Sequence, residues 1–215
     1  MKMRTSTFFL LTCLISCYTV SVAQADLIFE FKESTTGSAT VQQGIGGTAV
    51  LGVFVKSDGT NDAFDSFDLY IDVGGDGNGL PSGITFSNSA VVAGADFPNA
   101  AKNPQSDVTS PFANADIQVS ADRTPLTFST EEIKLFDLQI EVAPTVLAGD
   151  ISVAARDDSG GLMAFNLNGT NLFASNASAF TFNPGAISVS AVPEPSSFGL
   201  LAISATALFR RRSRG

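Results

Sequence analysis

The stretch best suited to bind an ion is rich in glycine and reads Asp72-Val73-Gly74-Gly75-Asp76-Gly77-Asn78-Gly79. Carboxylate and amide oxygens on a flexible loop are the ligands that calcium prefers, so Asp72, Asp76 and Asn78 are candidate calcium ligands. The EF-hand pattern is not met, because Gly74 stands where a second ligand belongs. The alternative is a tight loop that leaves a strand, in which the glycines supply positive φ.

Other chemistry is restricted by what the chain lacks. It contains no histidine, which excludes serine–histidine and cysteine–histidine nucleophile systems. Three carboxylate pairs could in principle serve glycoside hydrolysis: Asp65 with Asp68, Glu131 with Glu132, and Asp157 with Asp158. In a strand the members of each pair would point to opposite sides. We therefore expect a protein that is not an enzyme and has no cofactor beyond the candidate calcium.

The elements that would carry these residues are β-strands. Apolar and polar residues alternate over 27–32, 65–73 and 135–142, which predicts strands with one face on a core and one in water. In this pattern Asp68, Asp72 and Asp137 belong to the water side. Further strands are expected at 48–56, 83–86, 116–120, 126–129, 150–155, 161–167, 179–182 and 186–190. No amphipathic helix of ten residues is evident, so a two-sheet sandwich or a barrel is predicted.

Composition supports one dry core in a domain spanning residues 26–190. Of the 18 phenylalanines, two lie before residue 26 and two after residue 190, which leaves fourteen in the domain. The domain also holds 20 of the 21 acidic residues but only six of the 12 basic ones, a net charge of −14. This charge argues against nucleic acid and anionic membrane surfaces as partners. It suits a protein that must stay soluble outside the cell.

The C-terminus has the form of a sorting device. Val192-Pro193-Glu194-Pro195 is stiff and extended because proline fixes φ and lacks an N–H group. The apolar stretch 198–209 has 12 residues, or roughly 18 Å as a helix, whereas a bilayer core needs about 20 residues. Arg210, Arg211 and Arg212 follow, and they should stay on the cytoplasmic side. We therefore expect a short, temporary membrane anchor.

This tail, residues 191–215, resembles the sorting signal of bacterial PEP-CTERM proteins. The resemblance implies export, brief retention in the inner membrane, and processing by an exosortase-type enzyme. It further implies a cell that makes extracellular polysaccharide or biofilm, and a final place at the cell surface or outside the cell. It implies no activity for the domain itself.

The N-terminus is consistent with export. Residues 1–25 combine Lys2 and Arg4 with an apolar run and end in Ala23-Gln24-Ala25, the pattern of a cleaved signal peptide. Cleavage after Ala25 would remove both cysteines, so the domain could hold no disulfide. A second interpretation stays open, because Leu14-Ile15-Ser16-Cys17 resembles a lipoprotein box that would place a lipid on Cys17.

The order of the predicted strands in residues 33–155 is similar to that of the cohesin-like β-sandwich, a jelly-roll module. The similar segments include 47–53, 64–72, 135–140 and 148–153. The resemblance implies a module that binds another exported protein, as cohesins bind dockerins. Two hypotheses follow: a structural or adhesive surface protein associated with exopolysaccharide, or a cohesin-like module for a protein partner.

Overall fold

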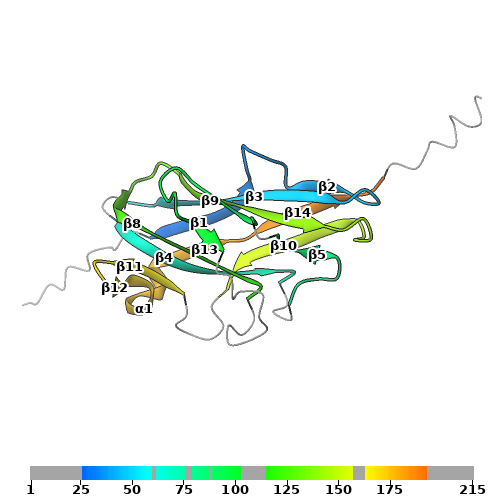
Figure 1. The fold of residues 1–215 in the computed structure, drawn as a ribbon. Helices are drawn as coiled ribbons and strands as arrows, with labels where there is room; N and C mark the ends of the chain where they lie inside the picture. Colours follow the sequence, from blue (N-terminus) through cyan, green and yellow to red (C-terminus); the bar gives the residue numbers. More distant parts are fainter. Residues whose placement is uncertain are drawn as a thin grey trace, which may run out of the picture.

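The computed structural model describes residues 26–59, 62–75, 79–87, 89–102, 115–156 and 163–192. Apart from two short helical segments, α1 (Leu172–Ser175) and η1 (Ala177–Ala179), its regular structure is β. The long strands run side by side between two ends of the domain (Figure 1). The predicted all-β, two-sheet sandwich is confirmed. No helix among the described residues has the length and apolar character needed to cross a membrane.

Two sheets form the sandwich. The six-stranded sheet follows the order β13-β1-β3-β9-β5, and β6 also pairs with β9. Its strands are β1 (Leu27–Glu33), β3 (Gly47–Ser57), β5 (Ile84–Thr85), β6 (Val91–Ala93), β9 (Ile133–Val142) and β13 (Phe180–Asn183).

The eight-stranded sheet follows the order β12-β11-β4-β10-β14-β2, and β8 connects β4 to β7. Its strands are β2 (Thr40–Gln42), β4 (Asp62–Val73), β7 (Ala101–Lys102), β8 (Ile117–Phe128), β10 (Gly149–Ala155), β11 (Ala164–Leu167), β12 (Thr170–Asn171) and β14 (Gly185–Ser190). Strand β4 is central, because it pairs with β8 along one edge and with both β10 and β11 along the other.

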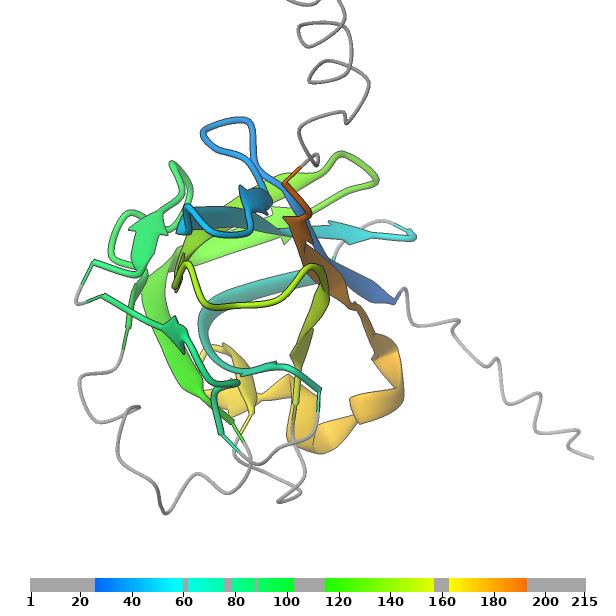
Figure 2. The same cartoon turned by 90° about the vertical axis from the view of Figure 1, so that its right-hand side faces the viewer.

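Both sheets contain pairings between distant parts of the chain. The C-terminal strands β13 and β14 run parallel to β1 and β2 respectively, while the other ladders are antiparallel. These parallel pairs join the N-terminal strands of the domain to its C-terminal strands. Figure 2 looks onto the end of the sandwich where the orange β14 leads out of the domain.

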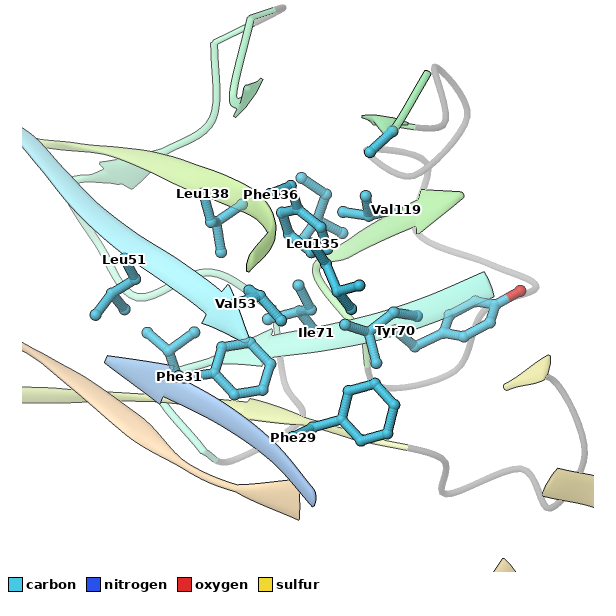
Figure 3. Close-up of a cluster of buried hydrophobic side chains, with 14 of the residues drawn as sticks. Phe29, Phe31, Leu51, Val53, Tyr70, Ile71, Val119, Leu135, Phe136 and Leu138 are labelled. Carbon is cyan, nitrogen blue, oxygen red and sulfur yellow. The ribbon is translucent and has the colours of Figure 1, made fainter. Parts of the chain in front are cut away.

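The predicted alternation places the right residues in the core. Phe67, Leu69, Ile71 and Val73 of β4 are buried, as are the inward residues of β1 and β9. In Figure 3, Phe29 and Val53 from one sheet approach Ile71 from the other. The phenylalanine rings make much of this contact, because their apolar edges and faces need no hydrogen-bond partner. The Phe64 and Phe128 ring centroids are 4.4 Å apart, for example.

One strand prediction was wrong. Residues 116–120 and 126–129 were expected to form two strands, but β8 runs without a break from Ile117 to Phe128. Pro125 is accommodated because the β4–β8 register shifts between Phe64 and Ser66, where β8 advances from Asp122 to Leu126. Proline cannot donate to a ladder, and an irregular point of this kind is where a strand tolerates it.

Candidate binding surface

The outer side of the eight-stranded sheet is a candidate binding surface. We call it the β4 face and define it by the outward side chains around the middle of β4. They are Ser66, Asp68, Tyr70 and Asp72 of β4, Gln118, Ser120 and Asp122 of β8, Asn166 of β11, and Arg156, which follows β10. Of these, Tyr70, Asp72 and Gln118 are buried beneath their neighbours. The sheet places them at adjacent register positions, so residues about fifty or a hundred apart in sequence share one surface.

Hydrogen bonds across the strands order this surface. Asp68 accepts one from the amide of Gln118 at 3.2 Å and one from the hydroxyl of Ser120 at 2.5 Å. The amide of Asn166 donates to the Ser66 hydroxyl at 3.2 Å. At the outer edge, Asp122 is exposed and accepts a hydrogen bond from Asn99. Donors, acceptors and carboxylates thus form a fixed array of polar groups.

The charge of the β4 face is unequal. Its described side chains include three carboxylates, on Asp68, Asp72 and Asp122, and one cationic group, on Arg156. Nearby, Asp116 uses its Oδ2 to accept the backbone N–H of Val73 at 2.7 Å. The face is therefore acidic among the side chains that the structure describes.

Asp72 differs from the sequence prediction, which placed it in water. Only 2 % of it is exposed, and its Oδ2 accepts a hydrogen bond from the Arg156 guanidinium at 3.1 Å. Its Oδ1 is buried and has no hydrogen-bond partner among the described groups. The alternation assigned the side of the strand correctly, but it could not show that this side is covered at Asp72.

The candidate calcium loop is only partly described. Asp76 and Asn78 lie outside the described residues, and the calcium hypothesis stays a prediction. Gly74, Gly75 and Gly79 all adopt positive φ, at 106°, 79° and 95°, as expected for a tight glycine loop. One carboxylate oxygen of Asp72 already accepts a hydrogen bond from the Arg156 guanidinium. Within the described ranges, no three histidine, cysteine, aspartate or glutamate side chains form a group that could hold a metal.

The opposite surface, the outer side of the six-stranded sheet, is built from paired charges. We call it the β3 face, with Glu30, Lys32, Lys56, Glu132, Lys134, Asp137 and Glu141 as its charged residues; Glu141 accepts a hydrogen bond from the Thr48 hydroxyl. Lys56 bonds to Glu30 at 2.8 Å, and Lys32 bonds to both Glu30 and Glu132. The hydrogen bond from Lys56 lowers the pKa of Glu30 and, in turn, raises the pKa of Lys56.

An aromatic ring lies beneath one of these lysines. The Lys32 ammonium sits 4.6 Å from the centroid of the Phe54 ring, within the range of a cation–π contact. The ring in turn lies against Gly52, since a Cβ there would come within 2.3 Å of the ring edge. The glycine therefore makes room for the ring to lie flat on the sheet.

Asp137 is the most heavily bonded carboxylate of the β3 face. It was expected in water, but only 2 % of it is exposed. It accepts hydrogen bonds from the hydroxyls of Ser34 and Thr36 and from the Lys134 ammonium at 2.9 Å. Burial alone would raise the pKa of Asp137, but these three hydrogen bonds outweigh it and hold the pKa below its ordinary value. The carboxylate fastens the segment after β1 to β9.

Asp65 and Asp68, one of the carboxylate pairs considered for catalysis, have separate partners. Asp65 accepts the backbone N–H of Asn168 at 2.8 Å, whereas Asp68 bonds to β8. In the second pair, the Glu132 carboxylate belongs to the lysine network of the β3 face, and Glu131 donates its backbone N–H to the Ser129 hydroxyl. Asp157 and Asp158 lie outside the described residues.

Of the sorting residues, only Val192 is described, and it is exposed directly after β14. Pro193, Glu194 and Pro195, the arginines Arg210, Arg211 and Arg212, and the cleavage residues Ala23 and Ala25 lie outside the described residues. The boundaries of the leader and the tail stay predictions.

Sequence reasoning missed most of the β4 face. The polar Gln118, Ser120 and Asp122 alternate with the apolar Ile117, Val119 and Ala121, so a period-2 signal was present. Splitting β8 into two strands hid it. Asn166 carried no usable signal, because its position opposite Ser66 depends on a pairing between residues one hundred apart.

Comparison with solved structures finds cohesin modules. This structure is similar to a non-cellulosomal cohesin from Archaeoglobus fulgidus, with 14% identity, 81% of this chain and 97% of that chain covered, and a TM-score of 0.46. It is similar to the third cohesin ScaC of Acetivibrio cellulolyticus, solved in complex with the ScaB dockerin, at 10% identity, 76% and 98% coverage, and a TM-score of 0.49.

A cohesin module from a family 33 glycoside hydrolase of Clostridium perfringens is also similar, at 7% identity, 78% and 99% coverage, and a TM-score of 0.43. At such identities the similarity concerns the fold alone. No protein-family model matches the chain. No curated protein matches it either.

Proposed function

We propose that this protein is an exported binding module without catalytic activity, which recognises another exported protein through the β4 face. The observation that carries this is the contrast between the two outer surfaces. On the β3 face each described lysine is bonded to a carboxylate, and Glu141 is bonded to the Thr48 hydroxyl. On the β4 face aspartates, hydroxyls and amides form an ordered array with one cationic side chain described.

An ordered acidic surface favours a partner with complementary charge. Cationic and hydrogen-bond-donating side chains on the partner would meet Asp68 and Asp122, and such complementarity governs specificity and association rate. Because Asp68 and Ser66 are already held by neighbours, little side-chain entropy would be lost on binding. The ScaC cohesin of Acetivibrio cellulolyticus was solved in complex with a dockerin, which is a property of that protein alone.

A protein partner is favoured over a polysaccharide by the placement of the aromatic rings. Sugar-binding sites commonly use an exposed ring as a platform. Among the described residues, the large hydrophobic side chains that are exposed are Ile45, Val92, Leu147 and Val192, and none is aromatic. Tyr70, the one tyrosine of the domain, is buried. Association with exopolysaccharide stays a prediction.

The destination of the module follows from the proposed sorting signal. The PEP-CTERM-like tail would hold the exported chain in the inner membrane until an exosortase-type enzyme removes the tail. The domain would then reach the cell surface or the medium, where its acidic character favours solubility.

Binding can be tested with two charge reversals that differ in position. We would immobilise the wild-type protein, Asp122→Lys and the control Glu131→Lys, and expose each to the proteins secreted by the same cells. Both changed side chains are exposed, but only Asp122 lies on the β4 face. We expect one discrete protein to bind the wild type and the control, and to bind Asp122→Lys about tenfold more weakly, equivalent to roughly 1.4 kcal/mol.

The affinity should also fall as salt is raised, because exposed charges are screened. Equal binding by all three proteins would contradict the β4 face as the site. Retention of polysaccharide without any discrete protein would replace the proposed partner with a glycan.

Sorting needs a separate test. Replacing Pro193-Glu194-Pro195 with alanines should leave the full-length chain in the inner membrane, whereas the wild type is processed and released. Membrane fractionation and mass spectrometry of the C-terminus would distinguish the two. Normal release of the triple variant would refute the motif assignment without affecting the binding experiment.

A further inference from the structure

Three neighbouring segments at one end of this strongly acidic domain contain no charged residue, and together we call them the uncharged end. They are the turn 43–46 between β2 and β3, the connection 143–148 between β9 and β10, and residues 191–192 after β14. The charged residues that flank the connection are Glu141 and Asp150. The three segments read Gln-Gly-Ile-Gly, Ala-Pro-Thr-Val-Leu-Ala and Ala-Val. Figure 1 places these segments at the end of the sandwich where β14 leaves the domain, and Figure 2 faces that end.

Backbone hydrogen bonds hold the three segments together. The N–H of Gln43 donates to the carbonyl of Ser190 at 2.9 Å, and the N–H of Gly44 donates to the carbonyl of Pro144 at 3.1 Å. A Cβ on Gly44 would lie 3.9 Å from the Val192 side chain. The chain exit is therefore in contact with the β2–β3 turn, which in turn contacts the β9–β10 connection.

This end also concentrates the exposed apolar side chains. Ile45 is 67 % exposed, Leu147 is 76 % exposed and Val192 is 49 % exposed. They are three of the four large hydrophobic residues that are exposed in the described part of the chain; the fourth, Val92, is on β6. Two loop tips and the chain exit thus present apolar groups on segments that contain no charged residue.

We propose that this uncharged end is a membrane-contact surface, with Ile45 and Leu147 inserted at the lipid interface while the tail anchors the chain. The inference rests on the anchoring role proposed above for residues 198–209. Between Val192 and Phe198 the chain makes six residue steps, which span at most about 20 Å. An anchored tail therefore keeps this end, and not the opposite one, beside the bilayer.

The physical properties of this end suit lipid better than a second copy of the chain. Side chains such as leucine and isoleucine gain free energy by leaving water for the headgroup and acyl boundary. The three segments contain no aspartate or glutamate, so they meet less repulsion at an anionic surface than the rest of the domain would. Three exposed apolar side chains fall far short of the roughly 800 Å² per partner that a stable dimer uses.

The chain has no tryptophan, so single tryptophans can report contact with lipid at chosen sites. We would introduce Leu147→Trp at the uncharged end and, as a matched control, Ala177→Trp, an exposed position in η1. The full chain would be produced with its own leader and reconstituted into vesicles of phosphatidylethanolamine with a minor share of phosphatidylglycerol. Acyl chains brominated near the headgroup would serve as the quencher. Mass spectrometry would establish both ends of the purified chain.

We expect the vesicles to quench the tryptophan at position 147 at least about threefold more strongly than the one at position 177. Equal quenching at both positions, or none at either in protein that stays with the vesicles, would overturn the membrane-contact surface and leave anchoring intact. Protein that fails to associate with vesicles would overturn the anchoring role, and the inference would fall with it. Neither outcome bears on partner binding by the β4 face.

Discussion

Asp137 on the β3 face and Asp72 on the β4 face are both buried carboxylates, but their hydrogen-bond partners differ. On the β3 face, Asp137 accepts hydrogen bonds from three side chains on two segments. On the β4 face, Asp72 has one guanidinium on Oδ2 and a buried Oδ1 without a partner in the described structure. Both residues are 2 % exposed, so the difference lies in their hydrogen-bond partners and not in their burial.

The difference fits the proposal that the β4 face, and not the β3 face, meets a partner. A buried charge is stable when its remaining lone pairs are satisfied, and a half-satisfied one costs free energy. On the β3 face the buried Asp137 has hydrogen-bond partners for both of its oxygens, and these bonds stabilise the fold. The β4 face keeps an unbalanced acidic character, as expected of a surface that meets a partner.

The largest effect should come from removing the well-bonded carboxylate. Asp137→Ala leaves Ser34, Thr36 and Lys134 without their common acceptor, and we expect the free energy of unfolding to fall by about 3 kcal/mol. Urea denaturation would measure this. Asp150→Ala is the control, since Asp150 is exposed and accepts one hydrogen bond from Ser188; it should change stability by less than about 0.5 kcal/mol. Similar losses of stability in the two variants would contradict a special stabilising role for the hydrogen bonds of Asp137.

The ion pair of the β4 face should behave differently. Arg156→Met strands a buried carboxylate, and we expect it to cost about 2 kcal/mol. Adding Asp72→Asn removes the buried charge and should restore about half of the lost stability. The recovery is incomplete because the asparagine side chain, like the Asp72 Oδ1 before it, keeps buried polar atoms without hydrogen-bond partners. The same denaturation experiment on both variants and the double variant gives the coupling energy. A strictly additive double variant would show that the two side chains do not stabilise each other.

Acid should reduce the contribution of Asp137. Its pKa is lowered in the folded protein, so the ionised form stabilises the fold above the unfolded-state value of about 4, and this stabilisation is lost as pH falls through the lower folded value. Relative to wild type, Asp137→Asn should be less stable by about 1–2 kcal/mol from pH 7 to about pH 5, and the gap should narrow below about pH 4. A gap that stays constant down to about pH 2 would contradict the lowered pKa.

The smallest effect is expected from the partly exposed lysines of the β3 face. Lys32→Met removes partly exposed ion pairs and the contact with Phe54, and should cost about 0.5 kcal/mol at low salt and less at high salt. Thermal unfolding at two salt concentrations would show both changes. A loss comparable to that of Asp137→Ala would mean that the network is a major source of stability.

Prediction from sequence succeeded where the signal is local. The inward residues of β1, β4 and β9 were identified because side chains alternate strictly along a strand, whatever the strand pairs with. The same regularity hid the burial of Asp72 and Asp137. An outward residue is exposed only if nothing covers it, and here a guanidinium from after β10 and two hydroxyls from after β1 do so.

The sequence by itself determined which side of each long strand faces the core, because that information is repeated every second residue. Only the tertiary structure decided which aspartates are buried, which residues share the β4 face, and that three uncharged segments meet at one end. Those outcomes depend on pairings between segments up to about 150 residues apart, such as β2 with β14. Alternation along a single strand carries no information about its partner, so this part of the architecture appears only once the chain is folded.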